Sequence, residues 1–338
     1  MRHPQRTLRR VGAAAAALSA LALATAAPAQ AGHRDYVALG DSYSSGESLS
    51  PYHRGTDTAI NQCHRSASAY PHGLARSVRA TSLTFRACSG AVTDDLYTPD
   101  HNGNKVTVDA LVPAQLSHVT RDTDLVTLTI GGNDVGFASV LGTCVYGDAG
   151  RSTRTDCSTD PALTAAVTAR LDALAGRGTA TTPHGLPITP LAKVIRDVRA
   201  KAPTAQILLG TYPRLVSRDL TGAECRVGGL TVVEDPSRTV PLYVSAVDAA
   251  WFDDTVTRLD RVILDAPRQA GVVGARAADV RPAYGAHALC SPTTTSWITP
   301  VKGTVSTATG AVTMDASSMH PTALGQDAYR IAFRDAVR

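Results

Sequence analysis

A serine with chemical potential follows a short apolar segment near the start of the chain. Residues 37–39 are Val-Ala-Leu, and Gly40-Asp41-Ser42 comes directly after them. Open α/β sheets bind ligands at the carboxyl ends of their strands, so we expect the Ser42 hydroxyl to face a ligand. A serine in that place acts as a nucleophile when a base and oxyanion-stabilising donors lie beside it.

Three further turns carry polar groups that suit this chemistry. They contain Gly90, Asn133 and His320, and each turn is marked by glycine or proline. A neutral imidazole removes a hydroxyl proton near pH 7, which makes His320 the candidate base. A backbone N–H and a side-chain amide stabilise an oxyanion, and glycine at position 90 lets the oxygen approach the backbone closely.

The four turns must be gathered by the elements around them. The β-branched apolar run 125–130 is typical of a strand buried on both faces of a parallel sheet. Strands that alternate with helices indicate an α/β fold with helices on both faces of the sheet. The predicted strands are 35–39, 83–87, 125–130, 206–210 and 277–280, and the predicted helices are 67–79, 112–119, 161–174, 191–201, 250–270 and 322–337.

Long segments between these elements have no regular pattern. We expect them to form the rim of the site, with 48–62 and 143–158 shaping its groove. The other irregular segments are 91–110, 215–248 and 284–318.

Residues 1–31 have the pattern of a secretory signal peptide. A basic start is followed by an Ala-rich apolar stretch and by Ala29-Gln30-Ala31, which fits an A-x-A cleavage site. The apolar run is too short for a membrane span. We therefore expect a secreted, extracellular protein, with residues 32–338 as a single catalytic domain and without stable membrane insertion.

The charge of the chain argues against a nucleic-acid partner. The 33 Lys and Arg residues outnumber the 29 Asp and Glu residues, but four of the arginines lie in the signal peptide. The mature chain is therefore formally neutral, without the basic surface of a nucleic-acid-binding protein.

The six cysteines indicate disulfide bonds, because the count is even and the chain carries an export signal. Six cysteines allow 15 connectivities. We expect the sequential one: Cys63–Cys88, Cys144–Cys157 and Cys225–Cys290. A zinc site is the rival use, but C-x-x-C and metal-type His spacings are absent from the sequence. We expect no metal and no cofactor.

Taken together, the four turns resemble the conserved blocks of the SGNH hydrolases, or GDSL lipase/esterase family. Their order and spacing match from Ser42 to His320, and GDSYSSGE with six cysteines is similar to secreted Streptomyces-type lipases and esterases. The resemblance implies a three-layer flavodoxin-like fold with Ser42 as nucleophile and His320 as base. It also implies an oxyanion hole of the Ser42 and Gly90 N–H groups and the Asn133 side chain.

The sequence departs from the family at one place. The family block has Asp three residues before the histidine, where this chain has Ser317. Some secreted members use a backbone carbonyl instead, so the resemblance implies that the Ser317 carbonyl orients the imidazole of His320. Asp315 is the alternative, as a carboxylate that orients the base.

The resemblance implies hydrolysis of lipid or other small carboxylic esters through an acyl-serine, by a protein we expect to be a monomer. A phospholipase or a carbohydrate O-deacetylase of the same family is the alternative. A secreted ester- or glycan-binding protein with a dead site is the alternative outside enzymes.

Overall fold

The computed structural model describes residue 1 and residues 34–99, 112–147 and 156–337. The expected signal peptide therefore lies, apart from Met1, outside the described residues, and its assignment stays a prediction. None of the helices in the described ranges has an apolar stretch that would span a bilayer.

A parallel sheet of five strands forms the centre of the fold. Its strand order is β2-β1-β3-β5-β8, and all four neighbouring pairs are parallel. This order places the crossovers on both sides of β1, as in flavodoxin-like sheets. The strands are β1 (Asp35–Gly40), β2 (Ser82–Phe85), β3 (Thr123–Thr129), β5 (Gln206–Gly210) and β8 (Ala275–Ala278).

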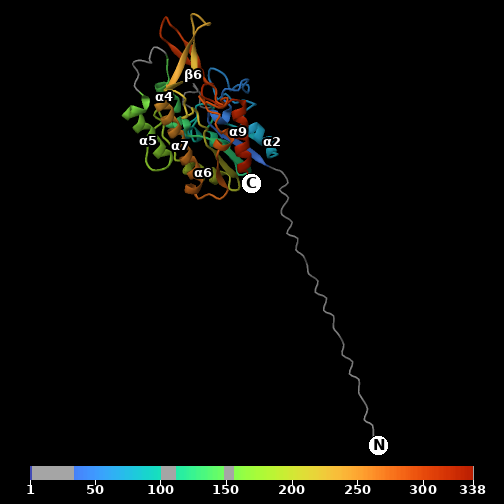
Figure 1. Ribbon diagram of the computed structural model, residues 1–338. Helices are drawn as coiled ribbons and strands as arrows, with labels where there is room; N and C mark the ends of the chain where they lie inside the picture. The colour runs from blue at the N-terminus through green and yellow to red at the C-terminus, as the bar shows by residue number, and fades with distance from the viewer. Residues whose placement is uncertain (2–33, 100–111, 148–155, 338) are drawn as a thin grey trace. The chain divides into compact units, whose positions relative to one another are not determined.

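Helices cover both faces of this sheet, as the sequence predicts. In Figure 1, α5, α6 and α7 lie on one side of the molecule and α2 and α9 on the other; α6 packs on α7, and α2 on α9. The longer helices are α2 (Tyr70–Ser77), α4 (Phe137–Cys144), α5 (Pro161–Leu174), α6 (Leu191–Lys201), α7 (Ala246–Ala270) and α9 (Ala323–Ala336).

The ends of the long helices follow from local chemistry. The Ser245 side chain accepts a hydrogen bond from the N–H of Asp248 and caps α7, which ends at Gly271 in the left-handed region. Asp160 caps α5 in the same way, with Pro161 at the first helical position. The bounds predicted for α5, α6 and β5 are confirmed.

The helix predicted over 112–119 is wrong. Only a short 3₁₀ helix forms there, at Gln115–His118. Pro113 disfavours helical backbone at the residue before it. The Gln115 side chain instead bonds to strand β1, accepting from the Gly40 N–H at 2.7 Å and donating to the Gly40 carbonyl at 2.9 Å.

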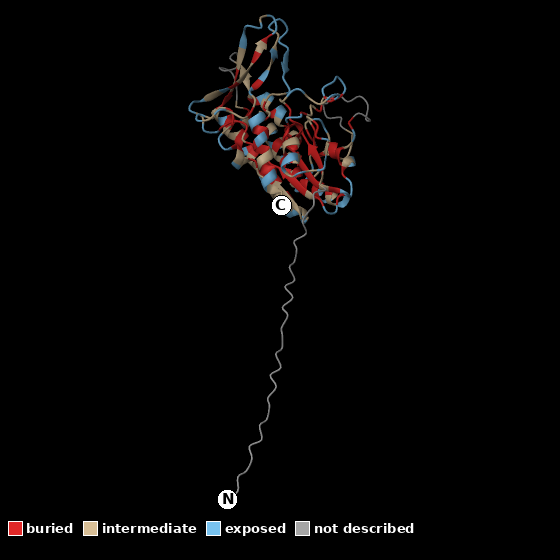
Figure 2. Cartoon of the chain, turned by 90° about the vertical axis from the view of Figure 1, so that its right-hand side faces the viewer, coloured by how far each residue is buried: buried red, intermediate tan, exposed pale blue. Residues whose placement is uncertain are grey.

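A second sheet occupies segments that the sequence analysis treats as irregular. Its order is β10-β9-β6-β7-β4, and its outer strands are far less buried than the central sheet (Figure 2). Its strands are β4 (Tyr146–Gly147), β6 (Glu224–Val232), β7 (Thr239–Ser245), β9 (Val301–Val305) and β10 (Val312–Met314).

The second sheet is missed chiefly because β6, its longest strand, contains two adjacent glycines and a shift of register. The pairing of β6 with β7 shifts register between Arg226 and Gly228. At Gly228 a Cβ atom would lie 1.9 Å from the Val301 carbonyl oxygen, so the close approach of β6 and β9 requires glycine. In a sequence, a glycine at such a position favours the prediction of a turn over that of a strand.

Three disulfides are present in the structure, and they join the sequential pairs. Cys63 bonds to Cys88, Cys144 to Cys157 and Cys225 to Cys290. The first lies two residues before Gly90, the second connects the end of α4 to the segment before α5, and the third ties β6 to the loop after α8 (Arg281–Tyr284).

Replacing Cys63 and Cys88 together by serine should lower both stability and activity. Opening this loop is expected to reduce the free energy of unfolding by about 3 kcal/mol, and kcat should fall because the loop carrying Gly90 loses its anchor. Chemical denaturation and ester hydrolysis measure the two effects.

The matched control is the Cys225→Ser/Cys290→Ser variant, which should lose stability but retain kcat. Equal loss of kcat in both variants would show that the Cys63–Cys88 bond has no special effect on the site.

Candidate active site

The nucleophile candidate lies at the start of a single helical turn. Ser42 is the first residue of α1 (Ser42–Ser45), directly after β1, and is buried. Gly40 makes this turn possible, because its φ is +120° and a Cβ there would lie 2.4 Å from the Thr129 carbonyl oxygen. The turn thus holds Ser42 at the carboxyl edge of the sheet.

Asp41 fixes this turn from inside the protein. Its carboxylate accepts hydrogen bonds from the Tyr43 N–H at 3.0 Å, from the Thr129 hydroxyl at 2.6 Å and from the Tyr212 hydroxyl. Burial raises the pKa of Asp41 to about 6, even though these hydrogen bonds oppose the rise. Asp41 therefore has a structural role: it supports the turn that carries Ser42.

Tyr212 connects the nucleophile turn to the turn of Asn133. Its hydroxyl donates to Asp41 and accepts from the Gly132 N–H at 3.1 Å. Burial, then the charge of Asp41, raises the pKa of Tyr212 well above its ordinary value, so the hydroxyl stays protonated. Tyr212 is not predicted as a site residue from the sequence, although a tyrosine two residues after a buried strand is a usable signal.

Asn133 reaches the turn of Gly90. It lies in the short helix α3 (Gly132–Val135), and its Nδ2 atom donates to the Ala91 carbonyl at 3.0 Å. An amide nitrogen has two hydrogens, so one is left for a ligand. Gly90 has a φ of +82°, which glycine adopts without strain.

Asp134 connects its own turn, which carries Asn133, to Thr93, three residues after Gly90. Its buried carboxylate accepts bonds from the Thr93 N–H at 3.1 Å and hydroxyl at 2.6 Å. Burial raises its pKa to about 7 against these bonds. These bonds give Asp134 a structural part in the site.

His320 approaches from the segment before α9. The Tyr43 hydroxyl donates to the Met319 carbonyl at 2.7 Å, and the rings of Tyr43 and His320 lie 5.3 Å apart. Gln326, which lies in α9 six residues after His320, donates its side-chain amide N–H to the Tyr43 carbonyl at 3.0 Å. The helix that carries Ser42 is therefore bonded directly to the segment that carries the base.

The group that orients the imidazole is not fixed by a hydrogen bond. The Nδ1 atom of His320 is buried and, within the part of the chain that the structure describes, has no hydrogen-bond partner. The Ser317 carbonyl accepts from the backbone N–H of His320 at 3.3 Å. The role of Ser317 stays a prediction.

The pKa of His320 is lowered from its ordinary value. Burial is the main cause, and it outweighs the charge of Glu47 and the carbonyls of Ser318, Ala316 and Ser317, which all raise the pKa. A lowered pKa keeps the imidazole neutral at pH 7, as a general base requires.

Asp315, the alternative acid, bonds elsewhere. Its exposed carboxylate accepts from the Ser317 N–H at 2.8 Å. The side chain of Ser317 and then its backbone N–H lower the pKa of Asp315. Asp315 thus stabilises the turn before His320.

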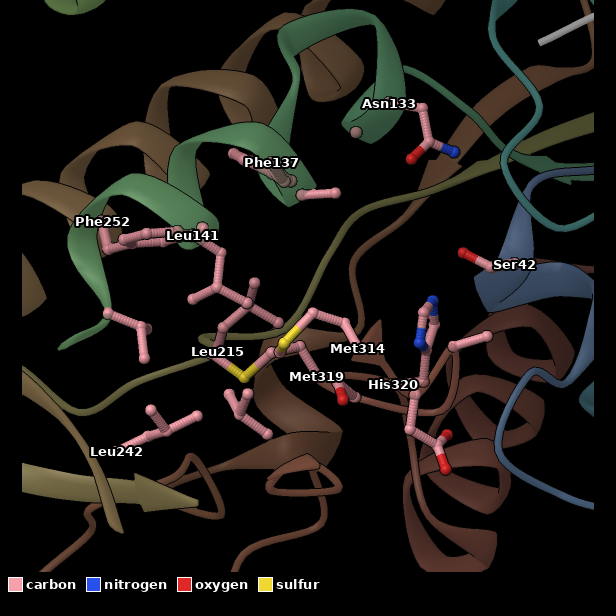
Figure 3. Close-up of a pocket in the computed structure, with 18 of the residues that line it drawn as sticks. Ser42, Asn133, Phe137, Leu141, Leu215, Leu242, Phe252, Met314, Met319 and His320 are labelled. Carbon is pink, nitrogen blue, oxygen red and sulfur yellow. The ribbon is translucent and has the colours of Figure 1, made fainter. Parts of the chain in front are cut away.

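A cavity of about 650 Å³ joins these groups to an apolar interior. Ser42, Asn133 and His320 line it, whereas Gly90 and Ser317 are not among the described residues that do. Figure 3 shows the three polar side chains at one side of the cavity. Its other side is formed by α4, α7 and the second sheet, with side chains such as Phe137, Leu141, Leu215, Leu242, Phe252 and Met314.

Sequence reasoning misses this apolar side. Residues 137–144 form α4, and the rest comes largely from strands within segments treated as irregular. Of the two segments expected to shape the groove, 143–158 contributes Val145 and Gly147, whereas 48–62 contributes none of the described lining residues. Across the described ranges, acidic, His and Cys side chains form no cluster that could hold a metal ion.

The parallel sheet with helices on both faces is a three-layer, flavodoxin-like α/β fold. Residues 38–328 match the model of the GDSL-like lipase/acylhydrolase family. The chain belongs to this family, and it is a carboxylic ester hydrolase.

Relatives in Streptomyces extend the match over nearly the whole chain. A lipase of Streptomyces rimosus is 32% identical over 328 residues, which is 95% of each chain. Lipase 2 of Streptomyces coelicolor is 32% identical over 307 residues, covering 88% of this chain and 90% of the relative.

Two solved structures are similar in fold. The phospholipase A1 of Streptomyces albidoflavus has a TM-score of 0.63 at 29% identity. The extracellular lipase of Streptomyces rimosus has a TM-score of 0.60 at 29% identity. In both comparisons 90% of this chain and 100% of the solved chain are covered.

The Asp315→Asn variant tests the alternative acid. Because this carboxylate caps Ser317 and makes no bond to the imidazole, kcat/KM should fall less than tenfold. Steady-state ester hydrolysis at several pH values measures the change. A loss of about a thousandfold would instead make Asp315 the group that orients His320.

Proposed function

We propose that this protein is a secreted serine esterase that hydrolyses the acyl esters of lipids. The observation that carries the proposal is the placement of Ser42, Asn133 and His320 at the polar side of a cavity that is otherwise apolar (Figure 3). The names of two relatives, a lipase and a phospholipase A1, support acylglycerols and phospholipids as substrates.

The reaction begins with the transfer of a proton. His320 takes the proton of the Ser42 hydroxyl as Oγ attacks the ester carbonyl carbon, and the carbonyl π electrons move to the oxygen. The N–H groups of Ser42 and Gly90 and the Asn133 side chain are the proposed donors to this oxyanion. One such donor contributes about 3 kcal/mol in comparable sites.

The collapse of the oxyanion breaks the bond to the alcohol. The imidazolium of His320 gives its proton to the leaving alkoxide, so the alcohol departs neutral and the acyl group stays on Ser42. Water then repeats the sequence: His320 removes its proton, the hydroxide attacks the acyl carbon, and the Ser42 oxygen leaves with a proton from His320. The products are the alcohol and the carboxylic acid, and no redox partner is needed.

The cavity suits the acyl chain. Burying one methylene from water contributes about 0.8 kcal/mol, so an acyl chain along Phe137, Leu141 and Leu242 gains binding energy with each carbon. This gain can hold the ester carbonyl beside Ser42. A sugar acetate would leave the apolar part of the cavity without a ligand.

Hydrolysis of p-nitrophenyl esters from acetyl to palmitoyl tests the proposal directly. Turnover should peak at medium or long chains and be abolished in the Ser42→Ala variant, which removes only the nucleophilic oxygen. Activity confined to acetyl esters would point to a carbohydrate O-deacetylase. No turnover, together with no labelling of Ser42 by a phosphonate, would indicate a binding protein.

The Leu141→Trp variant tests the direction of the acyl chain. A larger side chain in the cavity should shorten the preferred ester, with about tenfold loss of kcat/KM on long chains and little change on acetyl or butyryl esters. Leu324→Trp, an exposed position of α9 outside the cavity lining, is the matched control. Equal loss on all chain lengths would place the acyl chain elsewhere.

A further inference from the structure

One buried carboxylate next to the site takes no part in the proposed mechanism. Glu47 follows α1 and is only 1% exposed. A buried carboxylate is costly unless it is paired and hydrogen-bonded. Packing alone does not explain a buried carboxylate five residues after the proposed nucleophile.

Glu47 is held by a cation and a hydroxyl. The Nδ1 atom of His64 lies 2.6 Å from its Oε2 atom, and the Tyr52 hydroxyl donates to its Oε1 atom at 2.8 Å. The rings of Tyr52 and His64 stack with centroids 4.6 Å apart. The Nε2 atom of His64 faces Asp57 at 3.4 Å, so His64 has a carboxylate on both sides.

The same residue is connected to the proposed nucleophile and base segments. The Glu47 N–H donates to the Ser42 carbonyl at 3.1 Å. The next residue, Ser48, donates its hydroxyl to the Pro321 carbonyl at 2.8 Å, directly after His320. Glu47 thus lies where the turn of the nucleophile meets the turn of the base.

Its charge persists despite burial. Burial raises the pKa of Glu47, but hydrogen bonds from His64 and Ser89 and the charges of His320 and His64 reverse this and lower it to about 2. Burial lowers the pKa of His64, but the hydrogen bond with Glu47 and the charge of Glu47 outweigh burial. The pKa of His64 is therefore above its ordinary value. Glu47 is therefore ionised throughout the pH range of ester hydrolysis.

We propose that Glu47, clamped by His64 and Tyr52, is a positioning residue that supplies the negative charge opposite the imidazolium of His320. This inference rests on the proposed function, in which His320 carries a proton in the transition state. No carboxylate bonds to the His320 ring in the described part of the chain, so the charge must act through space. The ion pair with His64 keeps that charge ionised inside the protein.

The other titratable groups near this pair do not replace Glu47. Tyr43 packs on the His320 ring and stays protonated, because burial and the charge of Asp41 raise its pKa. Asp315 lies in the same segment as His320, but it is exposed to water, and the solvent screens the interaction of its charge with the imidazole. Tyr52 stays protonated because burial and Glu47 raise its pKa.

The Glu47→Gln variant tests the proposal, because it keeps the shape and removes the charge. Glu47 raises the pKa of His320, so its loss should move the acidic limb of kcat/KM down by roughly one pH unit. The maximum of kcat/KM should also fall about tenfold, because the imidazolium of His320 is less stable without the charge of Glu47. The p-nitrophenyl ester that the wild type hydrolyses best is the probe, read from pH 4 to 9.

The Asp57→Asn variant is the matched control. It removes the outer carboxylate of His64, which is 65% exposed, and should leave the limb in place. If Glu47→Gln does not fold, Glu47→Gln/His64→Gln replaces the ion pair by two neutral amides that hydrogen bond, a change that buried pairs often tolerate. The same downward shift is expected.

The proposal is overturned if the acidic limb of kcat/KM stays at the wild-type pH in either folded variant, even if the maximum of kcat/KM falls. A structural role would lower activity without changing the pKa of the base. This outcome differs from failure of the proposed function. In that case the wild type itself would lack ester turnover, or Ser42→Ala would retain it.

Discussion

The buried carboxylate of Asp41 is the interaction on which the site depends. It accepts hydrogen bonds from Thr129 at the end of β3 and from Tyr212 just after β5, while its own backbone continues β1. Three neighbouring strand ends are thereby tied to one group. Because Tyr212 also accepts from the Gly132 N–H, a displacement of any one of these strands would disturb both Ser42 and Asn133.

The geometry of the turn before Ser42 is predictable from sequence because it is local. Gly40, Asp41 and Ser42 follow an apolar strand, and both the φ of Gly40 and the cap by Asp41 are properties of a few adjacent residues. The parallel sheet is predictable for a related reason, since β3 is buried along nearly its whole length and therefore reads as an apolar run. α5 is predictable because it is rich in alanine and begins at Pro161, and α6 because its apolar residues recur at helical spacing between Pro190 and Pro203.

The second sheet and the acyl cavity are decided by contacts between distant segments. β6 pairs with β9, which lies some seventy residues later, and the pairing requires Gly228 against the Val301 carbonyl. β9 alternates apolar and polar residues over only five positions, and β6 is interrupted by Gly228 and Gly229, so the local pattern does not distinguish them from loops. The lining of the cavity is shared by α4 and this sheet, and therefore it becomes visible only when both are assembled.

In our proposal, the charge of Glu47 explains how His320 can act as a base without a bonded acid. Burial alone lowers the pKa of His320 and disfavours the imidazolium that forms as Ser42 attacks. A carboxylate bonded to the ring would correct this, but it would also fix the ring. A carboxylate that acts through space, and that is fixed by His64 and Tyr52 instead, stabilises the cation without a bond to Nδ1. In this proposal the charge that the acid of a triad would supply comes from a group that does not bond to the ring.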